Sequence, residues 1–324
     1  MLVSVLLFAV GLVLLIKGGD WFVDGATGIA KRFNLPDIVV GATVVSIGTT
    51  LPEVMVSTTG ALAGSGAMAY GNAIGSIICN TALIAAISIT CNPGPVNVKS
   101  MKTPAIFFFC SAALYCFASY VLGEFPRWMG FVMLSIFVVY MVLTVRNGMK
   151  NPDAAAEEEE EEKKERKLWQ ELLLLVAGAA VIAVGADLLV DHGQIIALEL
   201  GVPETVVALL FVALGTSLPE LVTTITSLKK GRASLGVGNV IGANVFNLVL
   251  VSGVAVSLAP FPVPCENFLL DTGLNMSLVL EIPVMLGVMS LMIFPAFATK
   301  KLGRWQGILL LAIYAAFCVC QFIL

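Results

Sequence analysis

Long apolar runs alternate with short polar segments along the whole chain. Ten of these runs are long enough to cross the hydrocarbon core of a bilayer as a helix, which takes about 20 residues. They lie at roughly residues 1–17, 38–62, 68–90, 104–122, 127–146, 169–190, 205–228, 234–259, 274–295 and 303–323. A backbone in lipid must satisfy its own hydrogen bonds, so runs of this length indicate helices. The pattern predicts an all-α polytopic membrane protein with ten transmembrane helices.

Composition agrees with this prediction and narrows the class of protein. Of the 324 residues, 58% are hydrophobic and only 12% are charged, whereas soluble domains carry about 25% charged residues. With a single histidine, the chain has no set of ligands for a histidine-based zinc centre. The lipid bilayer is the partner that the composition implies. We predict no cofactor, no nucleic acid and no obligate protein partner.

The two halves of the chain repeat each other. Residues 18–80 align with residues 185–247 at a constant offset of 167, with 22 identities in 63 pairs. Each half holds five predicted spans, an odd number, so the second copy enters the membrane from the opposite side. This predicts two inverted-topology repeats of five helices, with a substrate site near the midplane where the halves meet. The predicted parts are a first half at 1–148 (repeat core about 41–82), an acidic linker at 149–168, and a second half at 169–324 (repeat core about 208–249).

The distribution of positive charge predicts the orientation. With the N-terminus outside, 17 of the 18 lysine and arginine residues fall in the cytoplasmic loops or at their edges, as the positive-inside rule requires. The linker carries six consecutive glutamates at 157–162, and such a like-charged run is typical of a solvated connection. We therefore predict that both termini lie outside and that the acidic linker is cytoplasmic.

The most informative motif is "SIGTTLPE" at 46–53, which recurs as "ALGTSLPE" at 213–220. Residues three or four apart share one face of a helix, so each copy forms a polar stripe ending in a glutamate. Pro52 and Pro219 each remove a backbone donor, and we expect them to break the helix and free carbonyl groups. The stripes and their neighbours on the following helix are Ser46, Thr49, Thr50, Glu53, Ser76 and Asn80 in the first half, and Ala213, Thr216, Ser217, Glu220, Ala243 and Asn247 in the second.

These residues offer hard oxygen ligands at membrane depth. An unpaired carboxylate at the bilayer centre costs about 2.5–3.5 kcal/mol on insertion scales, and no lysine or arginine lies in the four spans that carry the motifs. The set suits Ca²⁺, Na⁺ or Mg²⁺ rather than copper or zinc, and its small flexible ligands favour Ca²⁺ over Mg²⁺. A hydrogen-bonded protonated acid would explain one such glutamate but explains a repeated pair poorly. Asn72 and Asn239 are candidates for supporting hydrogen bonds.

Two other classes of membrane protein, an intramembrane protease and a passive channel, are alternatives to a transporter. An intramembrane protease could use paired acids, but it does not need the flanking hydroxyls and freed carbonyls. A passive channel would show flux without a counter-ion.

The motif pairs "GTTLPE" with "GNAIGSIICN" and "GTSLPE" with "GNVIGANVFN" resemble those of the calcium/cation antiporter superfamily, specifically the short prokaryotic sodium/calcium exchangers. The resemblance covers nearly the whole chain. It implies that Glu53 and Glu220 hold Ca²⁺, with Thr49 and Thr216 assisting through backbone or hydroxyl oxygen. It also implies that sliding of the first and sixth helices exposes the site to alternate sides. It implies flanking Na⁺ sites shaped by Thr50, Ser217, Ser76, Asn80, Asn247 and the backbone of Ser46 and Ala213.

The chain departs from the family pattern at a few positions. Ile77 and Cys79 stand where asparagine and phenylalanine are usual, Ala243 where a hydroxyl residue often lies, and Asn247 where some members have aspartate. These departures affect the prediction of the coupling ion and of the stoichiometry more than the prediction of Ca²⁺ binding. The expected function is a secondary active antiporter that exchanges Ca²⁺ for Na⁺ across the plasma (inner) membrane by alternating access. Coupling to H⁺ or K⁺ through the same glutamates stays open.

Overall fold

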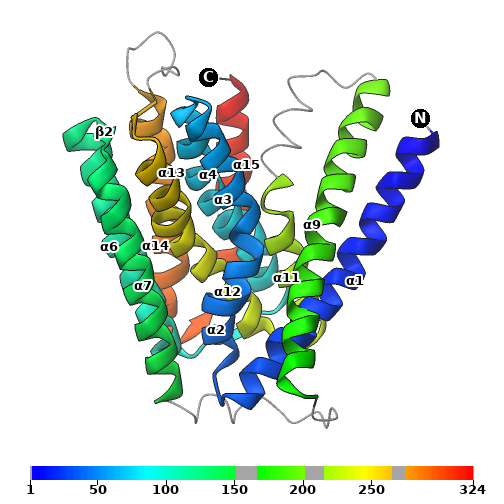
Figure 1. The fold of residues 1–324 in the computed structure, drawn as a ribbon. Coiled ribbons are helices and arrows are strands. Elements are labelled where there is room, and N and C mark those ends of the chain that lie inside the picture. Colours follow the sequence, from blue (N-terminus) through cyan, green and yellow to red (C-terminus); the bar gives the residue numbers. More distant parts are fainter. Residues whose placement is uncertain (1, 151–165, 201–214, 265–274, 324) are drawn as a thin grey trace.

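A computed structural model describes residues 2–150, 166–200, 215–264 and 275–323. The chain forms a bundle of long helices (Figure 1). Within the described residues, nine helical segments are long and apolar enough to cross a membrane. The predicted seventh span, 205–228, lies partly outside the described residues. Its described part begins at Gly215 and contains most of the helix Leu218–Lys229. The architecture confirms the predicted fold class.

Several spans contain a short π-helical turn, labelled η. The first half consists of α1 (Leu2–Arg32), α2 (Asp37–Val40), η1 (Gly41–Val45), α3 (Ser46–Leu62), α4 (Gly66–Cys79), η2 (Asn80–Ala85), α5 (Ala86–Cys91), α6 (Val98–Phe117), η3 (Ala118–Leu122) and α7 (Arg127–Met149). The second half consists of α9 (Leu168–Glu199), α11 (Leu218–Lys229), α12 (Ala233–Phe246), η4 (Asn247–Val251), α13 (Ser252–Leu258), η5 (Ser277–Glu281), α14 (Ile282–Thr299) and α15 (Arg304–Ile323).

The first and sixth helices are longer than the hydrophobic pattern predicted. Helix α1 has 31 residues and α9 has 32, against predicted spans of 1–17 and 169–190. Polar residues after position 17 do not end α1, because the side chain of Lys230 pairs with Asp24 at 2.9 Å and with Asp20 at 3.5 Å. Lys17 ends the predicted first span, and the orientation argument counts it at the edge of a cytoplasmic loop. It lies inside α1, so that placement is wrong.

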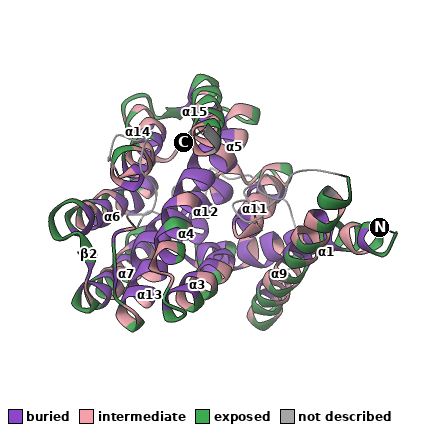
Figure 2. Cartoon of the chain, turned by 90° about the horizontal axis from the view of Figure 1, so that it is seen from above, coloured by how far each residue is buried: buried purple, intermediate pink, exposed green. Residues whose placement is uncertain are grey.

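Helices α1 and α9 pack against each other along a stripe of glycines. A Cβ atom placed on Gly18 would lie 2.9 Å from the backbone nitrogen of Ile182, and one on Gly178 would lie 2.5 Å from that of Phe22. Small residues let two membrane helices approach backbone to backbone. The two helices lie side by side at one edge of the bundle in both views (Figures 1 and 2). They form a paired unit beside the rest of the protein.

The interior of the bundle is centred on α12. Its span is the most buried of the nine, whereas those of α9 and α15 are among the most exposed, and buried residues gather around α12 and α4 (Figure 2). Helix α12 belongs to the second half but crosses α2 and η1 of the first half. There a Cβ atom on Gly41 would lie 2.7 Å from the backbone nitrogen of Asn239.

Two short strand pairs join the halves and display the inverted repeat. Strand β1 (Gly94–Pro95) pairs with β4 (Lys301–Leu302), and β2 (Glu124–Phe125) pairs with β3 (Phe261–Pro262). Strands β1 and β3 are 167 residues apart, the offset of the sequence repeat. Strand β2 lies at the end of the bundle that carries both termini, and β4 lies at the opposite end, where α15 begins (Figure 1). Equivalent pairs thus occur at opposite ends.

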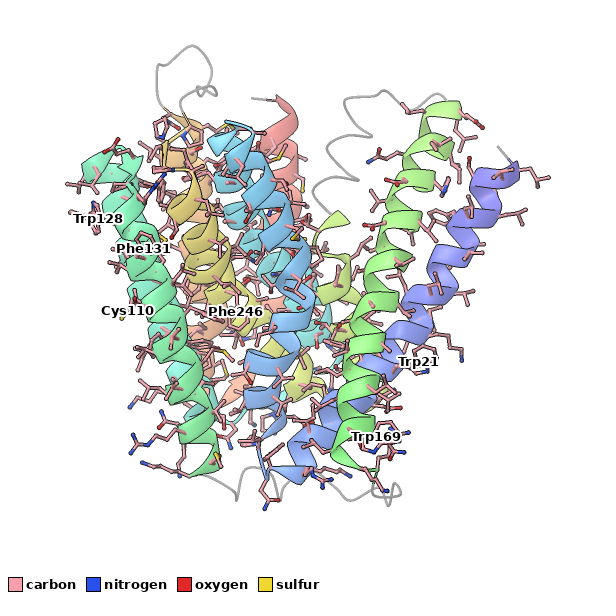
Figure 3. All side chains as sticks on the ribbon, viewed as in Figure 1. Trp21, Cys110, Trp128, Phe131, Trp169 and Phe246 are labelled. Atoms are coloured by element: carbon pink, nitrogen blue, oxygen red, sulfur yellow. The ribbon has the colours of Figure 1, made fainter. Side chains whose placement is uncertain are left out.

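The outer surface is apolar and has tryptophans near its two ends. Trp128 and Trp169 are exposed and lie toward opposite ends of the bundle (Figure 3). Tryptophan is enriched at both membrane–water interfaces, so this placement suits a bundle that spans a bilayer. Most of the predicted acidic linker, residues 151–165, lies outside the described residues.

Candidate ion-binding site

Two carboxylates, one from each half, lie together inside the bundle. Glu53 is on α3 and Glu220 is in the first turn of α11, and both are 0% exposed. They are close enough for their charges to repel each other. Within the described part of the chain, none of their four carboxylate oxygens has a hydrogen-bond partner. A buried carboxylate must be paired, bind a cation or be neutralised by a proton, so this pair indicates a site for a cation or a proton.

Hydroxyl groups of the same motif surround the carboxylates. Thr49 and Thr50 of the first half approach the carboxyl group of Glu220 in the second half. The hydroxyls of Thr50 and Ser217 are buried and have no hydrogen-bond partner among the described residues. The structure thus brings the predicted Thr49, Thr50, Glu53, Ser217 and Glu220 to one place, across the boundary between the halves.

The two prolines act differently in the two copies. Helix α3 continues from Ser46 to Leu62 through Pro52, so the predicted break there is wrong. Pro52 still lacks the N–H that would bond the carbonyl of Gly48, four residues earlier. In the second half, Thr216 and Ser217 form a turn, and α11 begins at Leu218 with Pro219 in its first turn. A helix can continue through proline when its surroundings hold it. In α3 the neighbouring Thr50 and Glu53 are buried inside the bundle, whereas Leu51 is exposed.

The asparagines predicted on the following helices occupy equivalent special positions. Asn80 begins the π-helical turn η2, and Asn247 begins η4. Both are fully buried, and neither amide has a hydrogen-bond partner within the described segments. Single π-helical turns in α-helices are frequent at functional sites. The two amides therefore add oxygen atoms that no other described group uses. Ser76, one turn before Asn80, is also buried.

The remaining predicted residues, Ser46, Thr216 and Ala213, differ in where the structure places them. Ser46 is buried, and its hydroxyl donates to the carbonyl of Gly41 at 2.8 Å or of Asn239 at 3.0 Å. Thr216 is only half-buried, beside Asn72. Ala213 lies outside the described residues. The structure therefore places ten of the eleven predicted residues.

Two groups that the sequence analysis did not include among the site residues lie near the site. The thiol of Cys79, which we took only as a departure from phenylalanine, interacts with Ser217 and Glu220. The hydroxyl of Tyr314, on α15, donates to the sulfur of Cys79 at 3.8 Å. A tyrosine within an apolar helix is a usable signal, because its hydroxyl needs a partner when buried.

The arrangement can hold a hard cation with neutral oxygens completing its shell. In the part of the chain that the structure describes, no three histidine, cysteine, aspartate or glutamate side chains converge. Among the described residues, the two glutamates therefore supply the negative charge of this site, and hydroxyl, amide and carbonyl oxygens supply its other ligands. Ca²⁺ accepts about six to eight such ligands in flexible geometry.

The chain is similar in sequence to a family of exchangers and to other membrane proteins. Residues 3–146 and 171–323 match the family described as sodium/calcium exchanger protein. The sodium/calcium exchanger MaX1 of Methanosarcina acetivorans is 31% identical over 355 aligned residues, covering 99% of each chain. An uncharacterized membrane protein of Methanocaldococcus jannaschii is 35% identical, covering 95% of this chain and 94% of its own.

The fold matches solved structures over nearly its whole length. The sodium-calcium exchanger NCX_Mj, soaked with 2.5 mM Na⁺ and 10 mM Sr²⁺, superposes with a TM-score of 0.80 at 33% identity, covering 98% of both chains. The family match and the relatives span both halves of the repeat. The chain belongs to the sodium/calcium exchanger family of membrane antiporters.

Proposed function

We propose that this protein is a secondary active antiporter that exchanges Ca²⁺ for Na⁺ across a prokaryotic plasma membrane by alternating access. The observation that carries the proposal is the buried pair of Glu53 and Glu220, whose carboxylate oxygens lack hydrogen-bond partners among the described residues. The family membership and the sodium/calcium exchanger MaX1 support the choice of ions.

In this proposal Glu53 and Glu220 hold Ca²⁺ between the halves, with Thr49 and Thr216 as further ligands. Their combined charge of −2 would be neutralised by one Ca²⁺. The proposed flanking Na⁺ ligands are Thr50, Ser217, Ser76, Asn80, Asn247 and the backbone of Ser46 and Ala213. Na⁺ and Ca²⁺ would then compete for the same two carboxylates.

The fluxes of Ca²⁺ and Na⁺ are coupled because the two ions cannot occupy the site at the same time. If either Ca²⁺ or Na⁺, but not both, can neutralise the carboxylates, each ion must leave before the other crosses. Each elementary charge moved across the membrane is worth about 2.3 kcal/mol per 100 mV. Exchange of three or more Na⁺ per Ca²⁺ would therefore respond to voltage.

The α1–α9 pair is the moving element in this proposal, and it would slide to open the site on alternate sides. The glycine stripe holds the two helices together as one unit. Lys230, after α11, links this unit to the rest of the protein through Asp20 and Asp24. These partly exposed ion pairs are weak, worth about 0–1 kcal/mol, so they permit sliding. We propose that both termini face outside and that the acidic linker is cytoplasmic.

Proton coupling is the second candidate, and one observation favours it. Ala243 is fully buried where the family often has a hydroxyl, and the Asn247 amide has no hydrogen-bond partner in the described residues. A Na⁺ position next to Ala243 would lack one oxygen ligand. A proton needs only the carboxylates.

Separate ion gradients distinguish these candidates. In proteoliposomes, we expect Ca²⁺ uptake when Na⁺ is higher inside than outside, and uptake should rise with an inside-positive potential. A K⁺ gradient or a pH gradient of the same size, without Na⁺, should drive little Ca²⁺ movement.

Uptake driven by the pH gradient but not by the Na⁺ gradient would replace Na⁺ by H⁺ as the coupling ion. Ca²⁺ movement without any counter-ion gradient and without exchange for trapped Ca²⁺ would contradict antiport itself. Empty liposomes and the Glu53→Gln protein serve as the two controls.

A further inference from the structure

We propose that Asn72 and Asn239 are positioning residues that set the direction of the Thr216 and Thr49 hydroxyl protons, so that the hydroxyl lone pairs face the cation. The proposal rests on the proposed ion-exchange function and deepens it. Neither asparagine is among the ligands derived above. Each belongs to one half of the protein and acts on a threonine of the other half.

The contacts of Asn72 fix which way its amide points. Its nitrogen Nδ2 donates to the backbone carbonyl of Glu53 at 3.2 Å and to the hydroxyl of Ser57 at 2.8 Å. A carbonyl oxygen can only accept, so the amide cannot be turned over without losing that bond. The oxygen Oδ1 therefore faces Thr216, whose hydroxyl donates to it at 3.4 Å.

Asn239 makes the equivalent contact in the other half. Its Oδ1 accepts from the hydroxyl of Thr49 at 3.2 Å, and the hydroxyl of Ser46 lies 3.3 Å away. Asn239 is fully buried, and its Nδ2 has no hydrogen-bond partner among the described residues. The side-chain amide of Asn239 thus acts here as a hydrogen-bond acceptor.

The repeat makes these two contacts copies of each other. Asn72 and Asn239 are 167 residues apart, as are Thr49 and Thr216. Asn72 accepts from the threonine of the second half, and Asn239 accepts from the threonine of the first. The two halves share about a third of their residues over the repeat, yet the structure forms the same crossed pairing twice.

The direction of a hydroxyl proton decides whether the group can bind a cation. A hydroxyl has one donor hydrogen and two acceptor lone pairs, and a hydrogen pointing at a cation would repel it. When Oδ1 of asparagine takes the hydrogen, both lone pairs of the threonine oxygen stay available for a cation. Because each pair crosses the boundary between the halves, the ligands are oriented only when the halves are docked together.

Leucine substitution tests the role, because leucine matches the size of asparagine but cannot accept the proton. We expect Asn72→Leu and Asn239→Leu to raise the Ca²⁺ concentration for half-maximal uptake by about 2- to 10-fold, the range for one lost neutral hydrogen bond. Direct ⁴⁵Ca²⁺ binding to the detergent-solubilised protein should weaken by the same factor. The maximal uptake rate per folded protein should change less.

Double mutants separate positioning from a structural role. If each asparagine acts through its threonine, adding Asn72→Leu to Thr216→Val should cost little beyond Thr216→Val alone, and the same should hold for Asn239→Leu with Thr49→Val. If the fold-losses in Ca²⁺ binding of the two single mutants multiply in the double mutant, the proposal is wrong. Asn239→Asp keeps the accepting oxygen and should bind Ca²⁺ at least as tightly as the native protein, and a loss as large as in Asn239→Leu would also overturn it.

Controls keep the result interpretable. Thr59→Val removes an exposed threonine hydroxyl that bonds only within its own helix, to Met55 and Val56, and should leave uptake unchanged. If the buried Asn239→Leu variant does not fold, the half-buried Asn72 with Thr216 carries the test. Native protein that binds no Ca²⁺ would refute the proposed function, whereas native binding with unaltered asparagine variants would refute only this inference.

Discussion

Replacing Glu53 or Glu220 with glutamine is expected to abolish Ca²⁺ transport without unfolding the protein. Glutamine has the same shape but no charge, so each variant removes half of the charge that faces Ca²⁺. Loss of one member of a buried charge pair costs about 2–5 kcal/mol, and about 3 kcal/mol corresponds to roughly a hundredfold weaker binding. Uptake of ⁴⁵Ca²⁺ into proteoliposomes should fall by about 30-fold or more at low Ca²⁺.

The melting temperature in detergent gives a second readout, which should stay the same or rise in the variants although their transport is lost. Without Ca²⁺, negative charges on both of these buried side chains would repel each other, so the glutamine variants should be as stable as the native protein or more stable. Added Ca²⁺ should raise the melting temperature of the native protein, because a ligand that binds only the folded state stabilises it. It should not do so in the variants.

A matched control and a contradicting result complete this test. Glu124 is exposed on β2, far along the chain from both motifs, and Glu124→Gln should behave as the native protein does. Normal Ca²⁺ exchange in either Glu53→Gln or Glu220→Gln would refute the assignment of the site. Unfolded variants would contradict the view that these carboxylates serve the ion rather than the fold.

Replacing Gly238 with leucine is expected to prevent the two halves from docking. A Cβ atom at this position would fall on the carbonyl group of Ile38, whose Cα atom lies 2.8 Å away. The clash is with backbone, which cannot rotate aside as a side chain can. Overpacking a core typically costs about 1–3 kcal/mol, and a backbone clash at the crossing of α12 and α2 should exceed that range. The variant should give little monodisperse protein by size-exclusion chromatography.

Gly287→Leu is the control for placing a leucine side chain on a helix glycine. Gly287 is exposed on α14, and no described atom lies within 4 Å of a Cβ placed there. This variant should elute and transport as the native protein does. A monodisperse, fully active Gly238→Leu protein would show that the close crossing of the halves is not needed.

The fold class and the relation between Glu53 and Glu220 could be predicted from the sequence because both depend on signals that repeat. Apolar runs give the helices, and the offset of 167 relates Glu53 to Glu220. The need of a buried carboxylate for a cation then follows from elementary electrostatics. The structure brings these two residues together from opposite halves.

Helix ends and helix breaks were predicted less well, because they depend on contacts with other segments. Helix α1 runs on past Lys17 because α9 and Lys230 accommodate its glycines and aspartates. Helix α3 continues through Pro52 although proline normally disrupts a helix interior. Local sequence shows the cost of such a residue but not the packing that offsets it.

Contacts between the halves were the hardest to predict. The pairing of Asn239 with Thr49 spans 190 positions, and nothing in either motif alone specifies it. The same holds for Gly238, which a reader of the sequence would assign generally to close helix contacts. Only the crossing of α12 with the first half shows what each glycine and asparagine contacts.

Equilibrium binding of ⁴⁵Ca²⁺ in competition with Na⁺ tests the central claim most directly. The claim is that Ca²⁺ and Na⁺ share one site built on Glu53 and Glu220. We expect one Ca²⁺ bound per chain, complete displacement by Na⁺, and a displacement curve steeper than one-to-one because more than one Na⁺ replaces each Ca²⁺. Ca²⁺ that stays bound at saturating Na⁺, or that binds equally well to the Glu53→Gln protein, would contradict the claim.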